Sequence, residues 1–279
     1  MEMENLLTKL TKDVKNSTKT LSRAEARYLV DTYYQMQAYR IRTANQVRSM
    51  DEEPHETLAF MKNNFEILEN QVKNILQAWV KNTPMGDWLF SITGVGPVIA
   101  AGLLAHLDIT KAPTPGHFQA YAGLDPTKEW KKGEVRPWNS ELKTLCWKLG
   151  ESFVKQSNRE NDIYGHIYKE RKDYEIAKNE AGEYAEQAKI KLEKFKIGKN
   201  TDAYKYYSEG KLPPAHIQER AKRYAVKIFL CHLHYAMYLN YYGKEPPLPY
   251  AIAILGHAHE IPCPNKDLIP IGTGNTEGE

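Results

Sequence analysis

Two glycines separate two apolar segments in the first half of the chain, in the run Ile92-Thr93-Gly94-Val95-Gly96-Pro97. Glycine adopts backbone angles that other residues resist, and proline suits the first turn of a new helix. The pattern therefore predicts a helix that ends near residue 92, a tight turn, and a second apolar helix from residue 97. Val95 would pack into the core, while unpaired N–H groups at the start of the second helix would point outward.

The start of a helix has the chemistry of an anion site, because its unpaired N–H groups lie at the positive end of the helix dipole. We therefore expect a phosphate-binding turn formed by Gly94, Val95, Gly96 and Val98. This is the pattern of a helix-hairpin-helix, a module that holds a nucleic-acid phosphate through its backbone. An ordinary tight turn between two core helices is the alternative interpretation of the glycines alone.

A second candidate binding segment, residues 124–137, is expected to be extended or looped. Its four cations are interleaved with aromatic residues, and the cations and the two nearest tryptophans are Lys128, Trp130, Lys131, Lys132, Arg136 and Trp138. Basic residues beside aromatic rings suit a surface that contacts a phosphate backbone or unpaired bases. A solvated hairpin with half-buried tryptophans explains the pattern equally well, so both interpretations stay open.

Histidines and cysteines in the C-terminal part suggest a zinc site, namely Cys231, His232, His234, His257, His259 and Cys263. Zinc requires four convergent ligands, which usually occur in closer pairs. On a helix, His232 and His234 would point to nearly opposite faces, so we expect packing histidines and neither a metal nor a cofactor. The spacing of the glycines also fits no dinucleotide-binding or nucleotide-phosphate motif.

Composition narrows the class of protein. The chain has 279 residues, of which 42% are hydrophobic and 26% charged, as in soluble globular proteins. A net charge of +3 neither requires nor excludes a polyanionic partner, so the local position of charge must decide. Three scattered cysteines, the absence of a secretory pattern at the start and the absence of a long apolar run predict a cytoplasmic protein with no membrane partner.

The elements that position these segments are expected to be helices. A heptad seam runs through Leu58, Met61, Phe65, Leu68, Val72, Ile75 and Trp79. Together with an amphipathic run from residue 21, it predicts an antiparallel helical hairpin. The seam would form a homodimer through residues 21–80, or it would form the core of a monomer.

The whole chain is expected to be mainly α, with a helical hairpin or coiled-coil arm, a helix-hairpin-helix body with a small extended segment, and a helical insertion. The predicted parts are a flexible lead-in (1–20), the arm (21–82), the helix-hairpin-helix domain (83–157), a polar helical insertion (158–212), a C-terminal helix that packs on the body (213–243) and a proline-rich tail (244–279). The mixed charges of the insertion favour a solvated face. Asn139 or Ser140 is expected to cap the helix after the basic segment.

Three groups of residues, in this order, resemble a known family: Ile92-x-Gly94-Val95-Gly96-Pro97 followed by Ala101, Leu103, Leu104 and Ala105; Phe118-x-Ala120-Tyr121-Ala122-Gly123-Leu124-x-Pro126; and Asn139-x2-Leu142-Lys143. The chain resembles the C-terminal domain of bridge-RNA-guided insertion-sequence transposases, which are related to pilin-gene invertases. The resemblance covers about residues 88–153 and extends weakly to residues 220–238. It implies DNA as the partner, with RNA as the alternative, and a dimerisation segment where the arm lies.

The sequence differs from this family in two respects that bear on activity. Family members begin with an RNase-H-like (RuvC-like) domain that carries four acidic catalytic residues, and we expect this domain to be missing because the arm starts near residue 20. The family's nucleophilic serine follows the Gly-Leu-x-Pro motif, where this chain has Trp130–Arg136 without a serine. Lysine cannot replace a hydroxyl that attacks a phosphodiester. Ser140 is the nearest hydroxyl and only a weak candidate nucleophile.

These features favour a transposase-like protein that binds nucleic acid, with DNA as the first choice, and that has no cleavage activity of its own. Two other interpretations stay open. In the first, the chain is a recombinase subunit that acts in DNA transposition with a RuvC-like partner in trans. In the second, it is a non-catalytic structural or oligomeric protein.

Overall fold

The computed structural model describes residues 11–50, 56–247 and 261–273. The fold is 70% helical, and no β-strand occurs in the described ranges, which confirms the prediction of a mainly α fold. The described elements are α1 (Lys12–Ser17), η1 (Thr18–Thr20), α2 (Arg23–Arg48), α3 (Glu56–Lys81), α4 (Gly86–Ser91), α5 (Pro97–His106), η2 (Ile109–Lys111), α6 (Pro115–Tyr121), α7 (Ser140–Gln156), α8 (Ile163–Glu180), α9 (Ala185–Lys194), α10 (Asp202–Ser208), α11 (Pro214–Tyr242) and η3 (Lys266–Leu268).

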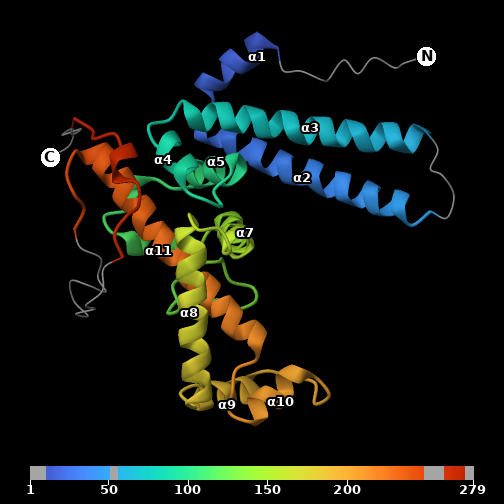
Figure 1. Cartoon of the computed structure of the whole chain (residues 1–279), viewed down its shortest axis with the longest axis vertical. Coiled ribbons are helices and arrows are strands. Elements are labelled where there is room, and N and C mark those ends of the chain that lie inside the picture. The colour runs from blue at the N-terminus through green and yellow to red at the C-terminus, as the bar shows by residue number, and fades with distance from the viewer. Residues whose placement is uncertain (1–10, 51–55, 248–260, 274–279) are drawn as a thin grey trace.

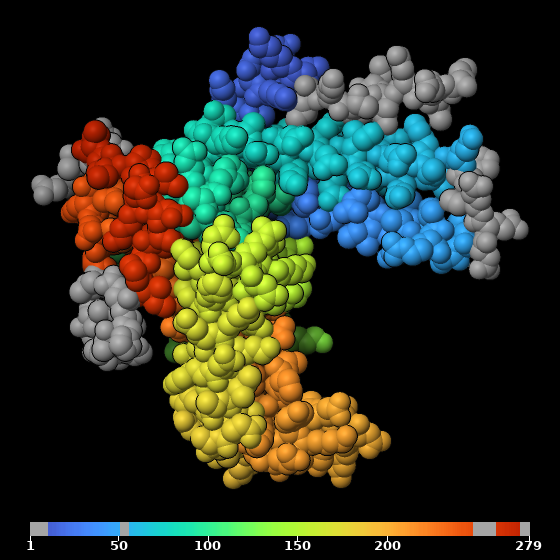
Figure 2. Space-filling model, viewed as in Figure 1, coloured from blue at the N-terminus to red at the C-terminus, as the bar shows by residue number. Residues whose placement is uncertain are grey.

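Two elongated arms leave a central helical body in different directions (Figure 1, Figure 2). The first arm is the hairpin of α2 and α3, which lie side by side. Tyr39 of α2 stacks on Phe65 of α3, so this part of the heptad seam faces the other helix of the same chain. The homodimer through residues 21–80 stays a prediction. The expected flexible lead-in, residues 1–20, contains two helical elements, α1 and η1. The second of them contacts α3.

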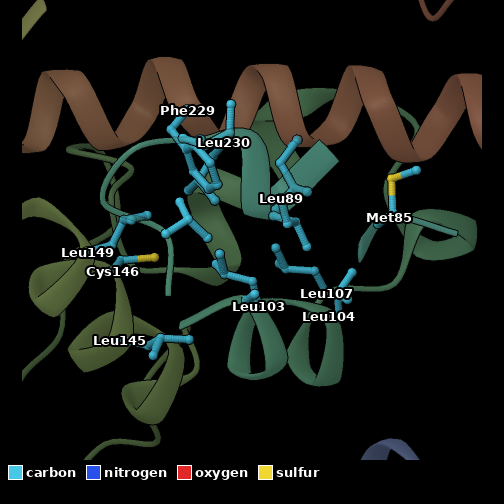
Figure 3. Close-up of a cluster of buried hydrophobic side chains, with 14 of the residues drawn as sticks. Met85, Leu89, Leu103, Leu104, Leu107, Leu145, Cys146, Leu149, Phe229 and Leu230 are labelled. Carbon is cyan, nitrogen blue, oxygen red and sulfur yellow. The ribbon is translucent and has the colours of Figure 1, made fainter. Parts of the chain in front are cut away.

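The body is built around α5, which contacts α2, α3, α4 and α7. This helix is apolar all round, as expected for a helix that other helices surround. Leucines from α4, α5 and α7 converge with Phe229 and Leu230 of α11 in one hydrophobic core (Figure 3). At Gly102, an added Cβ would lie 2.6 Å from the Cδ2 atom of Leu145. Helices α5 and α7 therefore pack closely, and this contact fixes the position of α7.

The second arm, called the distal arm below, consists of α8, α9, α10 and the first half of α11 (Figure 1). It has a small core of its own, formed by Tyr184, Leu212 and Ile217. The carboxylate of Glu175 is 1% exposed and accepts hydrogen bonds from several side chains of the arm, namely Arg171, Tyr184 and Arg220. The predicted polar insertion is therefore internally packed as well as solvated on its outer face.

The C-terminal part returns to the body. Helix α11 ends at Gly243, whose φ of +66° suits glycine at a helix end. Pro264 lies beyond this helix end, and its carbonyl accepts a hydrogen bond from the indole N–H of Trp88. Part of the predicted proline-rich tail therefore contacts α4. Among the described helices, none has the length and apolar character needed to cross a membrane.

Candidate nucleic-acid interface

The glycine turn, residues 92–96, connects α4 to α5. Gly94 has a φ of +93°, in the region that favours glycine, and its carbonyl accepts a hydrogen bond from the hydroxyl of Ser152 at 2.7 Å. The side chain of Val95 is buried, as the sequence predicts. However, the N–H of Val95 donates to the carbonyl of Ile92 at 3.0 Å. Val95 thus shapes the turn, and its amide is not one of the free donors that the sequence led us to expect.

The free donors lie at the first residues of α5. Gly96 is the N-cap and Pro97 the first helical residue, and the first backbone hydrogen bond runs from the N–H of Ala100 to the carbonyl of Gly96. The N–H groups of Gly96, Val98 and Ile99 therefore have no acceptor among the described residues. A Cβ added to Gly96 would meet nothing within 4 Å, so the space beside this first residue of the helix start is open.

The opposite end of α5 is occupied by cations of the protein itself. The guanidinium of Arg23 donates to the carbonyls of Leu104 and Leu107, and that of Arg27 donates to the carbonyl of Ala105. These arginines lie where cations favour the negative end of a helix dipole. Helix α5 thus has neutralised carbonyls at its C-terminus and unoccupied amides at its N-terminus.

The start of α5 opens into a cavity of about 410 Å³, called the first cavity below. Four helices and the glycine turn surround it, and its lining consists of Tyr33, Tyr34, Gln37, Lys73, Gly94, Gly96, Pro97, Val98, Ile99, Trp147, Lys148, Glu151, Ser152 and Lys155. The N-terminus of α5 at residues 96–99, called the helix mouth below, is therefore accessible and not enclosed in the core. This accessibility is the condition that an external anion requires.

Positive charge dominates the first cavity. Lys73, Lys148 and Lys155 line it, whereas Glu151 is the one acidic residue among the described residues of the lining. Glu151 forms an ion pair with Lys222, which is 3% exposed and also pairs with Glu219. Burial opposes the charge of Lys222, but hydrogen bonds to the two carboxylates hold the pKa of Lys222 above its usual value.

The three cavity lysines lack a carboxylate partner in the part of the chain that the structure describes. Lys73, Lys148 and Lys155 form no ion pair with a described residue. The ammonium of Lys148 lies 3.6 Å from the ring centroid of Tyr34. Burial lowers the pKa of Lys148 because water is displaced from its charged form. An anion in the first cavity would compensate these positive charges.

The predicted basic segment, residues 124–137, forms a loop, and its cations do not act as one group. Arg136 lines a cavity of about 570 Å³, called the second cavity below, together with Trp130, Trp138, Ser140, Lys143, Thr144 and Trp147. The other three cations, Lys128, Lys131 and Lys132, are exposed and line neither the first nor the second cavity. The guanidinium carbon of Arg136 lies 5.0 Å from the ring centroid of Trp130. The two cavities adjoin at Trp147, which lines both.

Ser140 does not serve as the helix cap. The side-chain oxygen of Asn139 accepts a hydrogen bond from the N–H of Leu142 at 2.8 Å, and Ser140 is the first residue of α7. The hydroxyl of Ser140 is exposed and forms no hydrogen bond with a described residue. It lines the second cavity and a third of about 420 Å³, which His106 and Glu141 also line.

Sequence reasoning missed most of the residues that surround the helix mouth. Many of them come from α7, namely Trp147, Lys148, Glu151, Ser152 and Lys155, and the same helix also carries Ser140, Lys143 and Thr144, which line the second cavity. Another face of this helix carries the buried residues Leu142, Leu145, Cys146, Leu149 and Phe153. A tryptophan on the polar face of an amphipathic helix is the signal that could have revealed this surface.

The two histidines of α11 contact different elements. His232 bonds the hydroxyl of Tyr164 and the carbonyl of Ile261, whereas His234 bonds the carbonyl of Ala112. In the ranges that the structure describes, no group of three or more His, Cys, Asp or Glu residues could hold a metal ion. His257 and His259 lie outside those ranges.

A glycine turn with free amides beside a lysine-lined cavity has the geometry of a module that binds phosphate through its backbone. Residues 86–130 match the sequence model of the family described as Transposase IS116/IS110/IS902. The match spans α4, the glycine turn, α5, α6 and the first part of the basic segment, and it supports an IS110-type transposase-related domain in this part of the chain. No curated protein and no solved structure matches the chain.

Proposed function

We propose that the chain is a transposase-like protein that binds nucleic acid, with DNA as the preferred partner, by holding a phosphate at the start of α5 in a helix-hairpin-helix. The observation that carries this proposal is the first cavity, whose lining includes Gly96, Val98 and Ile99, the residues whose amides have no acceptor among the described residues, together with three lysines from α3 and α7. The family match over the same turn supports it independently.

The binding chemistry follows from these groups. Oxygens of a backbone phosphate accept hydrogen bonds from the amides of Gly96, Val98 and Ile99, and the dipole of α5 favours the negative charge. Because Gly96 has no side chain, the phosphate reaches the backbone directly. Lys73, Lys148 and Lys155 add attraction that does not depend on base sequence. Affinity should therefore fall steeply with salt and show little sequence preference.

Gly96→Asp tests this site sharply. Aspartate is among the best N-cap residues, and Gly96 has a φ of −87° with open space around it, so the variant should fold as stably as the native protein. Its carboxylate would occupy the free amides and repel phosphate. We expect binding to duplex DNA, measured by fluorescence anisotropy at low salt, to fall by more than tenfold while the thermal midpoint is unchanged or higher.

The matched control is Gly198→Asp, which adds the same charge at an exposed loop position of the distal arm. This control should bind like the native protein. Equal affinity of both variants would refute the helix mouth as the binding site. A native protein that binds neither DNA nor RNA would instead favour the non-catalytic structural interpretation.

A second candidate function is that of a transposase subunit that works with a RuvC-like protein in trans. The observation that favours it concerns Ser140, which is exposed and lines two cavities. Its hydroxyl forms no hydrogen bond with a described residue and does not cap α7. In a mixture reconstituted with such a partner, strand transfer should then depend on Ser140 and be lost in Ser140→Ala. Strand transfer that persists in this variant would exclude Ser140 as the nucleophile.

A further inference from the structure

The second cavity has a composition that the phosphate site does not explain. Three of the five tryptophans of the chain line it, Trp130, Trp138 and Trp147. The other two, Trp79 and Trp88, are 6% and 0% exposed and belong to the core. By contrast, Trp147 is 53% exposed and Trp130 is 37% exposed. Large aromatic surface that a protein leaves in contact with water in one place marks a binding surface.

The described residues that line the second cavity carry charges of one sign. The charged ones are Arg136 and Lys143, and none of the described lining residues is a carboxylate. The ammonium of Lys143 lies 4.1 Å from the ring centroid of Trp138. Burial lowers the pKa of Lys143, and the positive charges of Arg136 and Arg223 lower it further. These crowded cations have no counter-ion from the lining, so an anionic ligand would relieve their repulsion.

The rings are held in position by contacts that leave much of their surface free. The indole N–H of Trp130 donates to the carbonyl of Glu134 at 2.7 Å, which fixes the ring within its loop. Trp147 lies 5.0 Å from the ammonium of Lys222, which is anchored by two ion pairs. Anchored aromatic rings lose little conformational entropy when a flat ligand stacks on them.

Exposed aromatic rings and cations in one cavity match two chemical parts of a nucleotide, the base and the phosphate. The flat base stacks on an aromatic ring, and the phosphate that links it to the next nucleotide pairs with a cation. In a duplex, the bases are stacked on one another inside the helix, so their faces are not available to side chains. Cavities that meet at Trp147 would allow one strand to run from the start of α5 to the tryptophans.

We propose that the second cavity binds unpaired nucleotides, so that the chain holds a single strand across α7, with one phosphate at the start of α5 and bases on Trp147 and Trp130. This inference rests on the proposed function and makes its substrate class specific. It identifies single-stranded DNA or RNA, and not duplex, as the ligand that uses both cavities.

The test compares binding of short single strands and of a duplex of equal length to the native protein and to Trp130→Ala. Trp130 lines the second cavity and not the first, and it is 37% exposed in a loop, so the variant should fold and keep the phosphate site, and Trp130→Phe keeps an aromatic ring as the matched control. We expect oligothymidylate or oligouridylate to quench tryptophan fluorescence of the native protein. In Trp130→Ala, single-strand affinity should fall roughly tenfold, duplex affinity should change less than twofold, and Trp130→Phe should retain most single-strand binding.

Equal loss of single-strand and duplex affinity in Trp130→Ala, or no loss at all, would overturn the inference. So would a native protein that binds duplex but not single strands, a result that leaves the proposed phosphate site standing. Failure of the native protein to bind any polynucleotide would remove both the inference and the proposed function. If single strands bind, a comparison of oligodeoxyuridylate with oligouridylate, which differ only in the 2′-hydroxyl, identifies which sugar the cavity prefers.

Discussion

At the scale of single residues, the two glycines of the turn have different roles. The sequence suggests that both serve binding. In the structure, Gly94 is required by the fold, because its φ is +93° and an added Cβ would lie 3.0 Å from the ring of Phe153. Gly96 has an ordinary φ and open surroundings, and it is the one beside the free amides. The glycine that the fold needs is therefore separate from the glycine that a ligand would need.

This separation predicts unequal effects of an added side chain at the two positions. Gly94→Ala should destabilise the protein by about 1–3 kcal/mol, because a Cβ is strained at positive φ and crowds Phe153. Gly96→Ser keeps a favourable N-cap residue in open surroundings and should change stability by less than about 0.5 kcal/mol. Urea denaturation followed by circular dichroism measures both. Equal destabilisation by the two substitutions would contradict the assignment of Gly94 to the fold.

At the scale of elements, the distal arm depends on ionisable groups between α8, α9 and α11. Burial alone would raise the pKa of Glu175, but hydrogen bonds from Tyr184, Arg220 and Arg171 lower it. Burial lowers the pKa of His216 to about 4, and the positive charges of Lys191, Arg223 and Arg220 act in the same direction. Both groups therefore make the arm sensitive to acid, since the folded state favours the deprotonated form of each.

The histidine gives the arm a pH dependence that can be measured. The unfolded chain binds a proton at His216 near pH 6.5, whereas the folded chain does so only near pH 4. Stability contributed by the neutral ring is thus complete above pH 6.5 and is lost as the pH falls toward 4, by on the order of 2 kcal/mol. Hydrogen exchange of the arm amides should show this loss, and His216→Gln should reduce it. An unchanged pH profile in the variant would show that His216 is not the responsible group.

At the scale of the whole molecule, cations from two distant segments meet at one surface. Lys73 comes from the first arm, whereas Lys148 and Lys155 come from α7. The distal arm carries many further lysines, but acids are interspersed among them, and several form ion pairs such as Lys178 with Glu183 and Lys211 with Glu180. A net charge of only +3 therefore conceals a local positive cavity.

The salt dependence of binding should report this cavity. Lys148→Gln and Lys155→Gln should each reduce the slope of log K against log salt for duplex DNA by about 1, because each lysine would release about one counterion. Lys199→Gln on the distal arm is the control and should leave the slope unchanged. Titrations at four salt concentrations measure the slopes. If Lys199→Gln lowers the slope as much as the cavity variants do, the binding surface extends over the distal arm.

Short-range patterns were enough to predict the helices, the glycine turn and the mainly α class, because the periodicity of apolar residues and the backbone demands of glycine and proline act within a few residues. Only the tertiary structure decided which amides remain free. It also showed that the amide of Val95 donates to the carbonyl of Ile92, and that Asn139 and not Ser140 caps α7. It also placed Lys73 and Lys148 on the lining of one cavity, and Trp130 and Trp147 on the lining of another. Such neighbours are set by how α5 and α7 pack, through contacts such as Gly102 on Leu145, and no local pattern encodes that distance.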